Sequence, residues 1–277
     1  MARARAALDS IALNGPRPFV KWVGGKRQIV HELVARVPDA FGTYHEPFVG
    51  GGALFFAVRP QNAVLSDNNQ RLVRTWRGVR DHVDKVIRLL EKYPYDKDFF
   101  LQMRERDIDA ESDVEVAAWF IYLNKTAFNG LYRVNSKNRF NVPFGRYVNP
   151  AICDEPNLRA CAAALKPAAI EHEDFTAVLE RAQPGDFVYF DPPYVPLSDT
   201  AYFTKYTAEG FGPDDQRRLC DVARKLKKNG VHVLLSNSGA DFVRDLYKGF
   251  RVEEVLASRQ VNCKADGRGP IVELVIR

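Results

Sequence analysis

The stretch Phe187-Val188-Tyr189-Phe190-Asp191-Pro192-Pro193-Tyr194 decides the fold of this chain. Its first half is a short apolar run, which is typical of a buried strand in a parallel sheet. Two prolines directly after a strand end its hydrogen-bonding ladder and fix two φ angles, while the residue before them is held extended. The sequence therefore predicts an α/β fold with a rigid turn, residues 191–194, at the carboxyl edge of the sheet, where such folds bind ligands.

These four residues, named here the proline turn, offer a carboxylate, a free carbonyl and an aromatic ring. Asp191 and the Pro192 carbonyl can accept both N–H groups of an amino group on a planar ring, on which Tyr194 can stack. Such hydrogen bonds leave the nitrogen lone pair available for attack on an electrophile. The same residues also fit an ordinary strand-ending turn with a solvated Asp191 and a packed Tyr194, because a short motif is only a hypothesis.

A glycine-rich segment, Val49-Gly50-Gly51-Gly52-Ala53, follows a second strand pattern at residues 44–48. Successive glycines let the backbone approach a ligand closely, and the helix expected after them offers N–H groups at its start. The dinucleotide pattern G-x-G-x-x-G is not met, because Phe55 occupies its last position. The segment therefore favours a nucleoside site without phosphates.

Two other segments could complete such a site. The strand expected at residues 63–66 ends in Asp67, and an acidic residue at this place commonly accepts hydrogen bonds from ribose hydroxyls. Asp67 could instead be a helix N-cap. Residues 19–26, Phe-Val-Lys-Trp-Val-Gly-Gly-Lys, place a glycine pair, two cations and an indole before an amphipathic helix. This segment could also be a plain loop with a packed Trp22.

The basic character of the chain is local. Residues 116–153 contain no acidic residue and carry five positive charges, which equals the net charge of +5 of the whole chain: Lys125, Arg133, Lys137, Arg139 and Arg146. Such a patch indicates a polyanionic partner, although a solvated face is the usual alternative for a charge cluster.

Within this basic segment, residues 132–135 and 139–142 alternate apolar and polar side chains, which predicts a β-hairpin. One face is apolar for packing, and the other carries side chains that can read purine edges in the major groove: Arg133, Asn135, Arg139 and Asn141. Phe128, in the turn before the hairpin, could be a core anchor. It could also be a wedge that offsets the stacking lost when a base leaves the duplex.

The remaining patterns predict one large domain with an insertion. Residues 1–70 and 151–277 are expected to form the sheet domain, and residues 71–150 a mostly helical target-recognition domain that carries the hairpin. Helices are expected at residues 28–36, from Asp67 to about 90, and at 98–106, 114–122 and 213–226. Further strands are expected at residues 168–171, 231–236, 252–256 and 271–276. Lys264 and Arg268, in the loop at residues 262–269, could contact phosphates.

Composition excludes several classes of protein. No apolar run approaches the ~18 residues that a membrane span needs, and the basic residues 1–7 precede no apolar stretch of a signal peptide. The four cysteines form no C-x-x-C pair, which indicates reduced structural thiols and a cytoplasmic protein. The five histidines are scattered without ligand spacing, so no metal site is expected.

Taken together, six segments resemble the Dam-like DNA adenine-N6 methyltransferases of bacteria and phages, from Pro18 to Ile276. Each segment alone is weak evidence for this family, but the six in this order are very specific for it. They are Lys21-Trp22-Val23-Gly24-Gly25-Lys26, Glu46-Pro47-Phe48-Val49-Gly50-Gly51-Gly52, Ser66-Asp67-Asn68, Phe128-Asn129-Gly130-Leu131-Tyr132-Arg133-Val134-Asn135, Phe140-Asn141-Val142-Pro143-Phe144-Gly145 and Asp191-Pro192-Pro193-Tyr194.

The resemblance implies a Rossmann-like methyltransferase sheet with helices on both faces and S-adenosylmethionine as methyl donor, without a metal. The catalytic residues would be Asp191, Pro192, Pro193 and Tyr194. The donor would be bound by Trp22, Lys26, Glu46, Phe48, Gly50, Gly52, Asp67, Asp174, Phe175 and Asp191. Double-stranded DNA would be bound by Lys21, Phe128, Asn129, Leu131, Arg133, Asn135, Arg139 and Pro143.

The resemblance of residues 129–143 further implies methylation of a flipped adenine within GATC. A restriction endonuclease could belong to the same system without contacting this chain. Two alternatives stay open. An RNA adenine methyltransferase can share the proline turn, but it would not be expected to carry the hairpin. A non-catalytic DNA-binding regulator would not be expected to keep the proline turn and residues 22–26 intact.

Overall fold

The computed structural model of the protein describes residues 15–195, 211–258 and 270–277. The N-terminal residues 1–7, Cys263, Lys264 and Arg268 lie outside the described residues. Within them, Cys153, Cys161 and Cys220 are free thiols. No helix of the described part of the chain combines the length and the apolar character that crossing a membrane requires.

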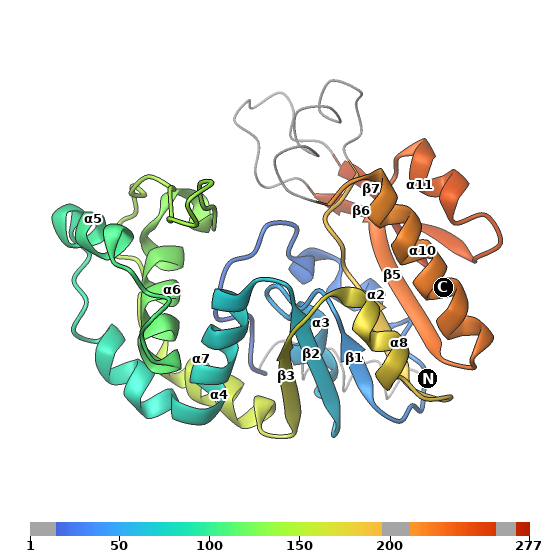
Figure 1. The fold of residues 1–277 in the computed structure, drawn as a ribbon, viewed down its shortest axis with the longest axis horizontal. Coiled ribbons are helices and arrows are strands. Elements are labelled where there is room, and N and C mark those ends of the chain that lie inside the picture. The colour runs from blue at the N-terminus through green and yellow to red at the C-terminus, as the bar shows by residue number, and fades with distance from the viewer. Residues whose placement is uncertain (1–14, 196–210, 259–269) are drawn as a thin grey trace. The chain divides into compact units, whose positions relative to one another are not determined.

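The fold is built on a seven-stranded sheet in the order β3-β2-β1-β4-β5-β7-β6. Parallel pairs join β1 to β2, β1 to β4 and β4 to β5, and antiparallel pairs join β5 to β7 and β7 to β6. The strands are β1 (Tyr44–Glu46), β2 (Ala63–Asp67), β3 (Ala168–His172), β4 (Phe187–Phe190), β5 (His232–Ser238), β6 (Val252–Ser258) and β7 (Pro270–Ile276). The expected α/β sheet is thus confirmed (Figure 1).

Strand β4 explains why an apolar run predicted this sheet. It pairs in parallel with β1 on one side and β5 on the other, so it is a central strand. All four of its residues are at most 1% exposed. A central parallel strand is buried on both faces and is apolar without alternation, which is the pattern of residues 187–190.

Capping side chains mark the starts of some of the helices, namely those that begin at residues 70, 97, 113 and 155. The helices that the structure describes are η1 (Lys26–Gln28), α2 (Val30–Val34), α3 (Ala53–Val58), α4 (Gln70–Leu90), α5 (Lys97–Glu105), α6 (Asp113–Thr126), η2 (Phe128–Gly130), α7 (Glu155–Leu165), η3 (Phe175–Ala177), α8 (Val178–Arg181), α10 (Pro213–Lys228) and α11 (Asp241–Leu246). Residues 28–36 are therefore not one continuous helix, because a 3₁₀ turn precedes α2. The N-cap of α4 is Asn69, whose side chain accepts the N–H of Leu72, so the N-cap interpretation of Asp67 is wrong.

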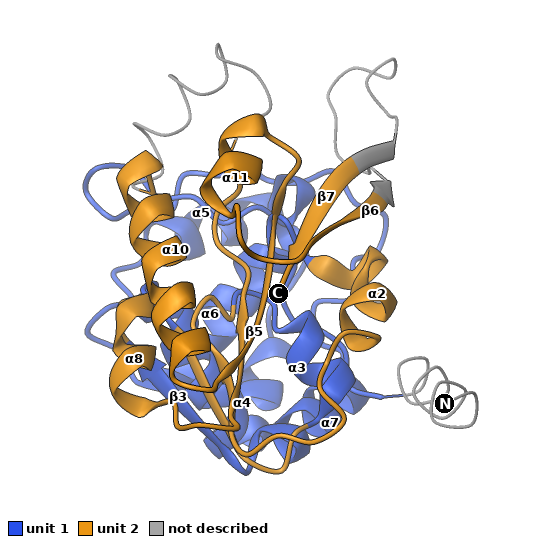
Figure 2. Ribbon diagram, turned by 90° about the vertical axis from the view of Figure 1, so that its right-hand side faces the viewer, with its two compact units in different colours: residues 1–25, 50–59, 67–172 blue, residues 26–49, 60–66, 173–277 orange. Residues whose placement is uncertain are grey.

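The chain forms two compact units (Figure 2). The first comprises residues 1–25, 50–59 and 67–172, and the second comprises residues 26–49, 60–66 and 173–277. In the first unit, α4 and α6 approach closely at Gly78, where a Cβ would lie 2.4 Å from the Asp113 carbonyl oxygen. In the second unit, the core of the sheet lies under α10 and includes Leu219, Leu226 and Leu235. The division into a sheet domain and a recognition domain at residues 71–150 stays a prediction.

Candidate active site

The Asp191 carboxylate follows directly after β4 and is held by charge and by a hydroxyl. Lys26 Nζ, on a side chain that is 3% exposed, lies 2.8 Å from Asp191 Oδ1. Ser236 Oγ donates to the same oxygen at 3.0 Å, and the Tyr189 hydroxyl lies 2.9 Å from Ser236 Oγ. Burial raises the pKa of Asp191, while Lys26 and then Ser236 oppose that rise. The ion pair therefore favours an ionised acceptor in a place that desolvation would otherwise neutralise.

Tyr194 is fixed at both ends of its side chain. Its hydroxyl donates to Glu273 Oε2 at 2.6 Å, and Lys26 Nζ lies 4.4 Å from its ring centroid. Burial raises the pKa of Tyr194 well above its usual value, and the charges of Asp191 and Glu273 add to this. Tyr194 is therefore a neutral ring with a defined orientation, one face of which is in contact with a cation.

A buried pair of amides fixes the backbone of the proline turn. Gln216 Nε2 donates to the Pro193 carbonyl at 2.9 Å, and Asn237 Nδ2 donates to Gln216 Oε1 at 3.0 Å. Both amide side chains are fully buried. Because neither amide can exchange its partner for water, the turn is tied to α10 and β5.

Four other residues that the sequence assigned to the donor also lie in the second unit. The rings of Phe48 and Phe175 stack with centroids 5.3 Å apart. Asp174 caps η3 by accepting the N–H and the hydroxyl of Thr176. It is therefore a helix cap next to the buried Phe175. Glu46 is buried and accepts the Tyr44 hydroxyl at 2.8 Å. Contact of these residues with a donor stays a prediction.

In the first unit, Asp67 ends β2 as a buried carboxylate. Oδ2 accepts the N–H of Gly50 at 3.2 Å, and Oδ1 accepts the N–H of Asn69 at 3.0 Å. Burial raises the pKa of Asp67 to about 6, against the effect of these N–H groups. The structure thus joins two residues that the sequence assigned to one site.

The glycine-rich segment needs glycine at two positions. Gly50 and Gly52 have φ values of +44° and +64°, which favour glycine. A Cβ at Gly50 would lie 2.5 Å from Cδ1 of Trp22, and one at Gly52 would lie 2.4 Å from Cη2 of Trp76. The backbone of this segment is therefore packed directly against two indoles.

The expected hairpin is present at residues 132–142. An antiparallel bridge joins Val134 to Phe140, and backbone hydrogen bonds run from Asn135 N to Arg139 O and from Asn141 N to Arg133 O, each at 2.9 Å. Phe140 and Val142 are buried, whereas Arg133, Asn135 and Arg139 are exposed. These residues follow the predicted packing face and outward polar face, whereas Tyr132, Val134 and Asn141 are half-buried. The Arg133 guanidinium donates across the hairpin to the Asn141 side chain at 2.7 Å.

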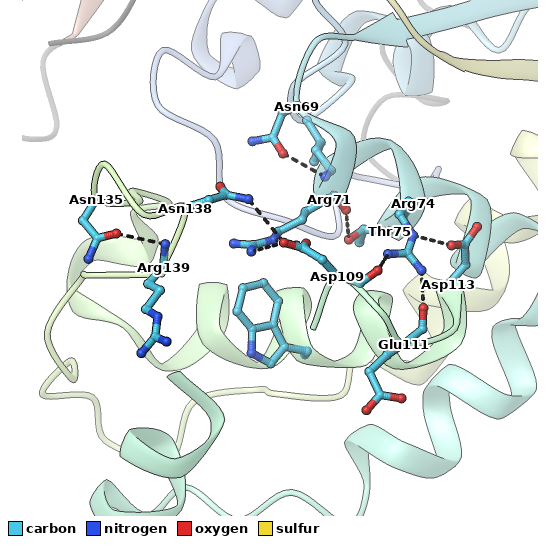
Figure 3. Close-up of polar contacts among 12 residues, drawn as sticks. Asn69, Arg71, Arg74, Thr75, Asp109, Glu111, Asp113, Asn135, Asn138 and Arg139 are labelled. Carbon is cyan, nitrogen blue, oxygen red and sulfur yellow. Dashed lines mark hydrogen bonds and ion pairs between the residues drawn. The ribbon is translucent and has the colours of Figure 1, made fainter. Parts of the chain in front are cut away.

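Polar contacts tie the tip of the hairpin to α4 (Figure 3). Arg71 forms a bidentate pair with Asp109, with Nε–Oδ1 and Nη2–Oδ2 distances of 2.6 and 2.7 Å. Asn138, in the hairpin turn, donates to Asp109 Oδ2 at 3.3 Å. A second arginine of α4, Arg74, pairs with Asp113 at 2.6 Å without contacting the hairpin.

The segment before the hairpin is exposed. The Phe128 side chain is 47% exposed, so the interpretation as a core anchor is wrong. Asn129 and Pro143 are also exposed. The backbone closes this segment, because the N–H of Phe128 donates to the Pro143 carbonyl at 2.9 Å. Contact of any of these residues with DNA stays a prediction.

Sequence reasoning missed three residues around the proline turn: Ser236, Gln216 and Glu273. Ser236 and Glu273 are polar residues inside the apolar strands β5 and β7, and such an interruption is a signal that a polar partner is buried nearby. Gln216 carried no signal, because it lies in a helix whose other polar residues face solvent. No group of acidic residues, histidines and cysteines suited to a metal is found among the residues that the structure describes.

Comparison with known proteins identifies the family of this chain. Residues 22–261 match the family of D12 class N6 adenine-specific DNA methyltransferases. The Type II methyltransferase M1.LlaDCHI of Lactococcus lactis subsp. cremoris is 44% identical over 268 residues, which are 94% of each chain. The Type II methyltransferase M.MjaIII of Methanocaldococcus jannaschii is 42% identical over 94% of this chain and 98% of its own.

A DNA adenine methylase of Vibrio cholerae is 34% identical over 94% of this chain and 95% of its own. These relatives match over nearly their whole lengths, as the family model matches over most of this chain. The chain belongs to the D12 class of N6 adenine-specific DNA methyltransferases.

Proposed function

We propose that this enzyme transfers a methyl group from S-adenosylmethionine to N6 of an adenine that is flipped out of double-stranded DNA, within GATC. The observation that carries the proposal is the proline turn. Its carboxylate is held by Lys26 and Ser236, and its aromatic ring is held by Glu273. A rigid acceptor beside a rigid ring suits an amino group on a planar base.

The first unit offers groups that fit a nucleoside donor. Asp67 is a buried carboxylate that accepts the N–H groups of Gly50 and Asn69, and a carboxylate has about four lone-pair sites, so it can also accept a ribose hydroxyl. Trp22 lies on Gly50 and offers an aromatic surface. Neither group supplies a phosphate site, which agrees with a donor that has no phosphate.

When bound, the donor would supply a sulfonium carbon that is already electrophilic. The chain then has to position the adenine amino group and to stabilise the charge that develops on its nitrogen. Asp191 and the Pro192 carbonyl would accept the two N–H groups of the adenine, and Tyr194 would stack on the base with the ring face opposite Lys26. The same acceptors would stabilise the positive charge that develops on the nitrogen.

Lys26 has a second task in this mechanism. Burial raises the pKa of Asp191, and the charge of Lys26 opposes that rise, so Lys26 favours the ionised carboxylate. An ionised Asp191 accepts hydrogen bonds from a nitrogen that becomes positive, whereas a protonated one would donate. Lys26 would therefore act through Asp191 in addition to the donor contact that the sequence predicts.

An adenine inside a duplex cannot reach a sheet edge, so the base would have to leave the stack. The exposed Phe128 is the side chain best suited to fill the space that the base leaves. The outward polar face of the hairpin would read the neighbouring bases in the major groove. The Type II names of two relatives support a companion endonuclease in the same system.

Transfer of a labelled methyl group onto a set of duplexes tests the proposal. The set holds one GATC duplex and duplexes that each change one of its base pairs, with a single-stranded RNA of the same sequence as control. We expect label on the adenine of GATC and a loss of at least tenfold at each changed position. Label on RNA alone would favour the RNA methyltransferase, and duplex binding without label on any adenine would favour the non-catalytic regulator.

A further inference from the structure

Asn124 lies near the carboxyl end of α6 and is 1% exposed. Its side chain makes three hydrogen bonds, all to backbone groups. Nδ2 donates to the carbonyls of Lys21 and Gly130, each at 2.8 Å, and Oδ1 accepts the N–H of Lys21 at 2.7 Å. One buried amide thus joins the loop that carries Lys21 to η2, the turn that precedes the hairpin.

Side chains join the same two segments. Gly130 has a φ of +65°, and a Cβ there would lie 2.3 Å from Cδ of Lys21, so the lysine stem lies directly on this turn. The Trp22 ring stacks with Tyr132, the first residue of the hairpin, at 6.2 Å between centroids. Phe120, one turn before Asn124 on α6, stacks with Tyr132 at 4.6 Å. The contact between the loop and the recognition segment is therefore both polar and aromatic.

The other end of this loop contacts the residues that we assign to the donor. The Trp22 indole fills the space where Gly50 would carry a Cβ, and the N–H of Gly50 donates to Asp67. Packed contacts thus run from Asp67 through Gly50 and Trp22 to the recognition segment. All of these residues belong to the first unit.

We propose that Asn124 is a positioning residue that couples binding of the methyl donor to reading of DNA. The inference rests on the proposed function, because it takes the donor to lie against Asp67 and Trp22. A donor that restricts the motion of Trp22 also restricts the backbone of Lys21. Because Asn124 is hydrogen-bonded to both Lys21 and Gly130, it would then restrict the backbone of Gly130 as well. Linkage requires that DNA tighten donor binding by the same factor, which is about 5–150-fold for typical couplings.

The chain offers a matched control in Asn157 of α7, which is also buried. Its Nδ2 donates to the carbonyl of Arg17 and its Oδ1 accepts the N–H of Arg17, both at 3.0 Å. Asn157 therefore holds a neighbouring part of the same N-terminal segment by the same pair of bonds. These bonds do not reach the recognition segment.

The test measures the dissociation constant of sinefungin, a donor analogue without a transferable methyl group, with and without a duplex that the wild-type enzyme methylates. The variants are Asn124→Asp and Asn157→Asp. Each keeps the size of the side chain and replaces the donating NH₂ by an oxygen. We expect the wild type and Asn157→Asp to bind sinefungin at least about fivefold more tightly with the duplex. For Asn124→Asp, the ratio of the dissociation constants without and with the duplex should be near one. Its kcat at saturating substrates should change by a smaller factor than this ratio does.

The inference is overturned if Asn124→Asp keeps the wild-type ratio, if both variants lose it alike, or if an active wild type shows a ratio of one. A wild type that methylates no duplex would instead overturn the proposed function itself. Should Asn124→Asp not fold, hydrogen exchange of the wild type decides. Sinefungin alone should slow amide exchange in peptides that cover residues 128–135, and unchanged exchange there would reject the coupling.

Discussion

The proline turn and the hairpin differ in how the rest of the protein holds them. In the proline turn, Asp191 is paired with an almost fully buried Lys26, and the backbone is tied by Gln216, which is itself fully buried. The hairpin has an isolated bridge instead of regular strands. At its tip it is held through Asp109, whose side chain is 47% exposed.

This difference matches what each segment has to do. Methyl transfer requires reacting atoms in near-attack geometry, and small displacements are costly in rate. Reading bases requires side chains that meet a duplex, and rotamer changes are common at such interfaces. Changes in the proline turn should therefore lower the rate on every sequence, whereas changes in the hairpin should alter the choice among sequences.

The largest effect is expected for Asp191→Ala. It removes the acceptor for the amino group, so methyl transfer should fall by about 10²–10³-fold or more, equally on all duplexes. Duplex affinity should stay close to that of the wild type, because the hairpin is untouched. Single-turnover transfer and a gel-shift titration measure the two quantities, and near-normal turnover would reject the role of Asp191.

The opposite behaviour is expected for Arg133→Ala. If Arg133 reads a guanine, its loss should cost about 1–3 kcal/mol of discrimination at one base pair and leave turnover on the preferred site nearly unchanged. The specificity ratio between GATC and its single-change duplexes measures this. Arg146→Ala, in the same basic segment but outside the hairpin, is the control. Equal weakening of Arg133→Ala on all sequences would make Arg133 a phosphate contact.

A third change tests whether the rigidity of the proline turn depends on its amide pair. Gln216→Leu frees the Pro193 carbonyl and leaves Asn237 buried without its acceptor, which should lower the free energy of unfolding by about 1–3 kcal/mol. Turnover should fall without a change in base preference. In the double variant Gln216→Leu with Asn237→Leu, part of the lost stability should return, because no amide side chain is then buried without its partner, although the Ser238 N–H loses the Asn237 side-chain oxygen that it donates to. Denaturant titration measures all three proteins.

The sequence predicted the elements whose patterns are local. The uninterrupted apolar run 187–190 predicted β4 because a central parallel strand is buried on both faces. The period of two at residues 132–142 predicted the hairpin and its two faces, because side chains alternate along a strand. Gly50 and Gly52, which the sequence singled out for a close approach to a ligand, have positive φ, a backbone conformation that leaves little choice of residue; their contact with the donor stays a prediction.

What the sequence did not predict depends on distant partners. Ser236, Glu273 and Gln216 reach the proline turn across tens of residues, and no local pattern encodes such a partner. The caps show the same limit at short range. Asp67 and Asn69 are both good N-cap residues, but Asp67 ends β2 and accepts the N–H groups of Gly50 and Asn69, and Asn69 takes the cap.

Asp67 offers a test by pH, because it is a buried carboxylate like Asp191. Its pKa is raised to about 6, so the carboxylate that accepts ribose hydroxyls is lost as pH falls through that value. Donor affinity should therefore be constant above pH ~7 and fall by up to about tenfold per pH unit below ~6. In Asp67→Asn, donor affinity should be weaker at all pH values and should not show this fall below pH ~6. Calorimetry with sinefungin at several pH values measures it, and a step that persists in Asp67→Asn would assign it to another group.

The smallest effect is expected for Asp109→Asn, which weakens the tie between α4 and the tip of the hairpin. Asp109 is about half exposed, so solvent screening limits the loss of stability to about 1 kcal/mol or less. Asp113→Asn is the matched control, since it weakens the neighbouring pair with Arg74, one turn further along α4 (Figure 3). Both variants should lose similar stability in thermal unfolding. Only Asp109→Asn should lower the specificity ratio between GATC and single-change duplexes, because only Asp109 contacts the hairpin, through Asn138. Equal specificity ratios in the two variants would mean that the hairpin is positioned by its own packing face, and the contrast with the proline turn would then be smaller than we infer.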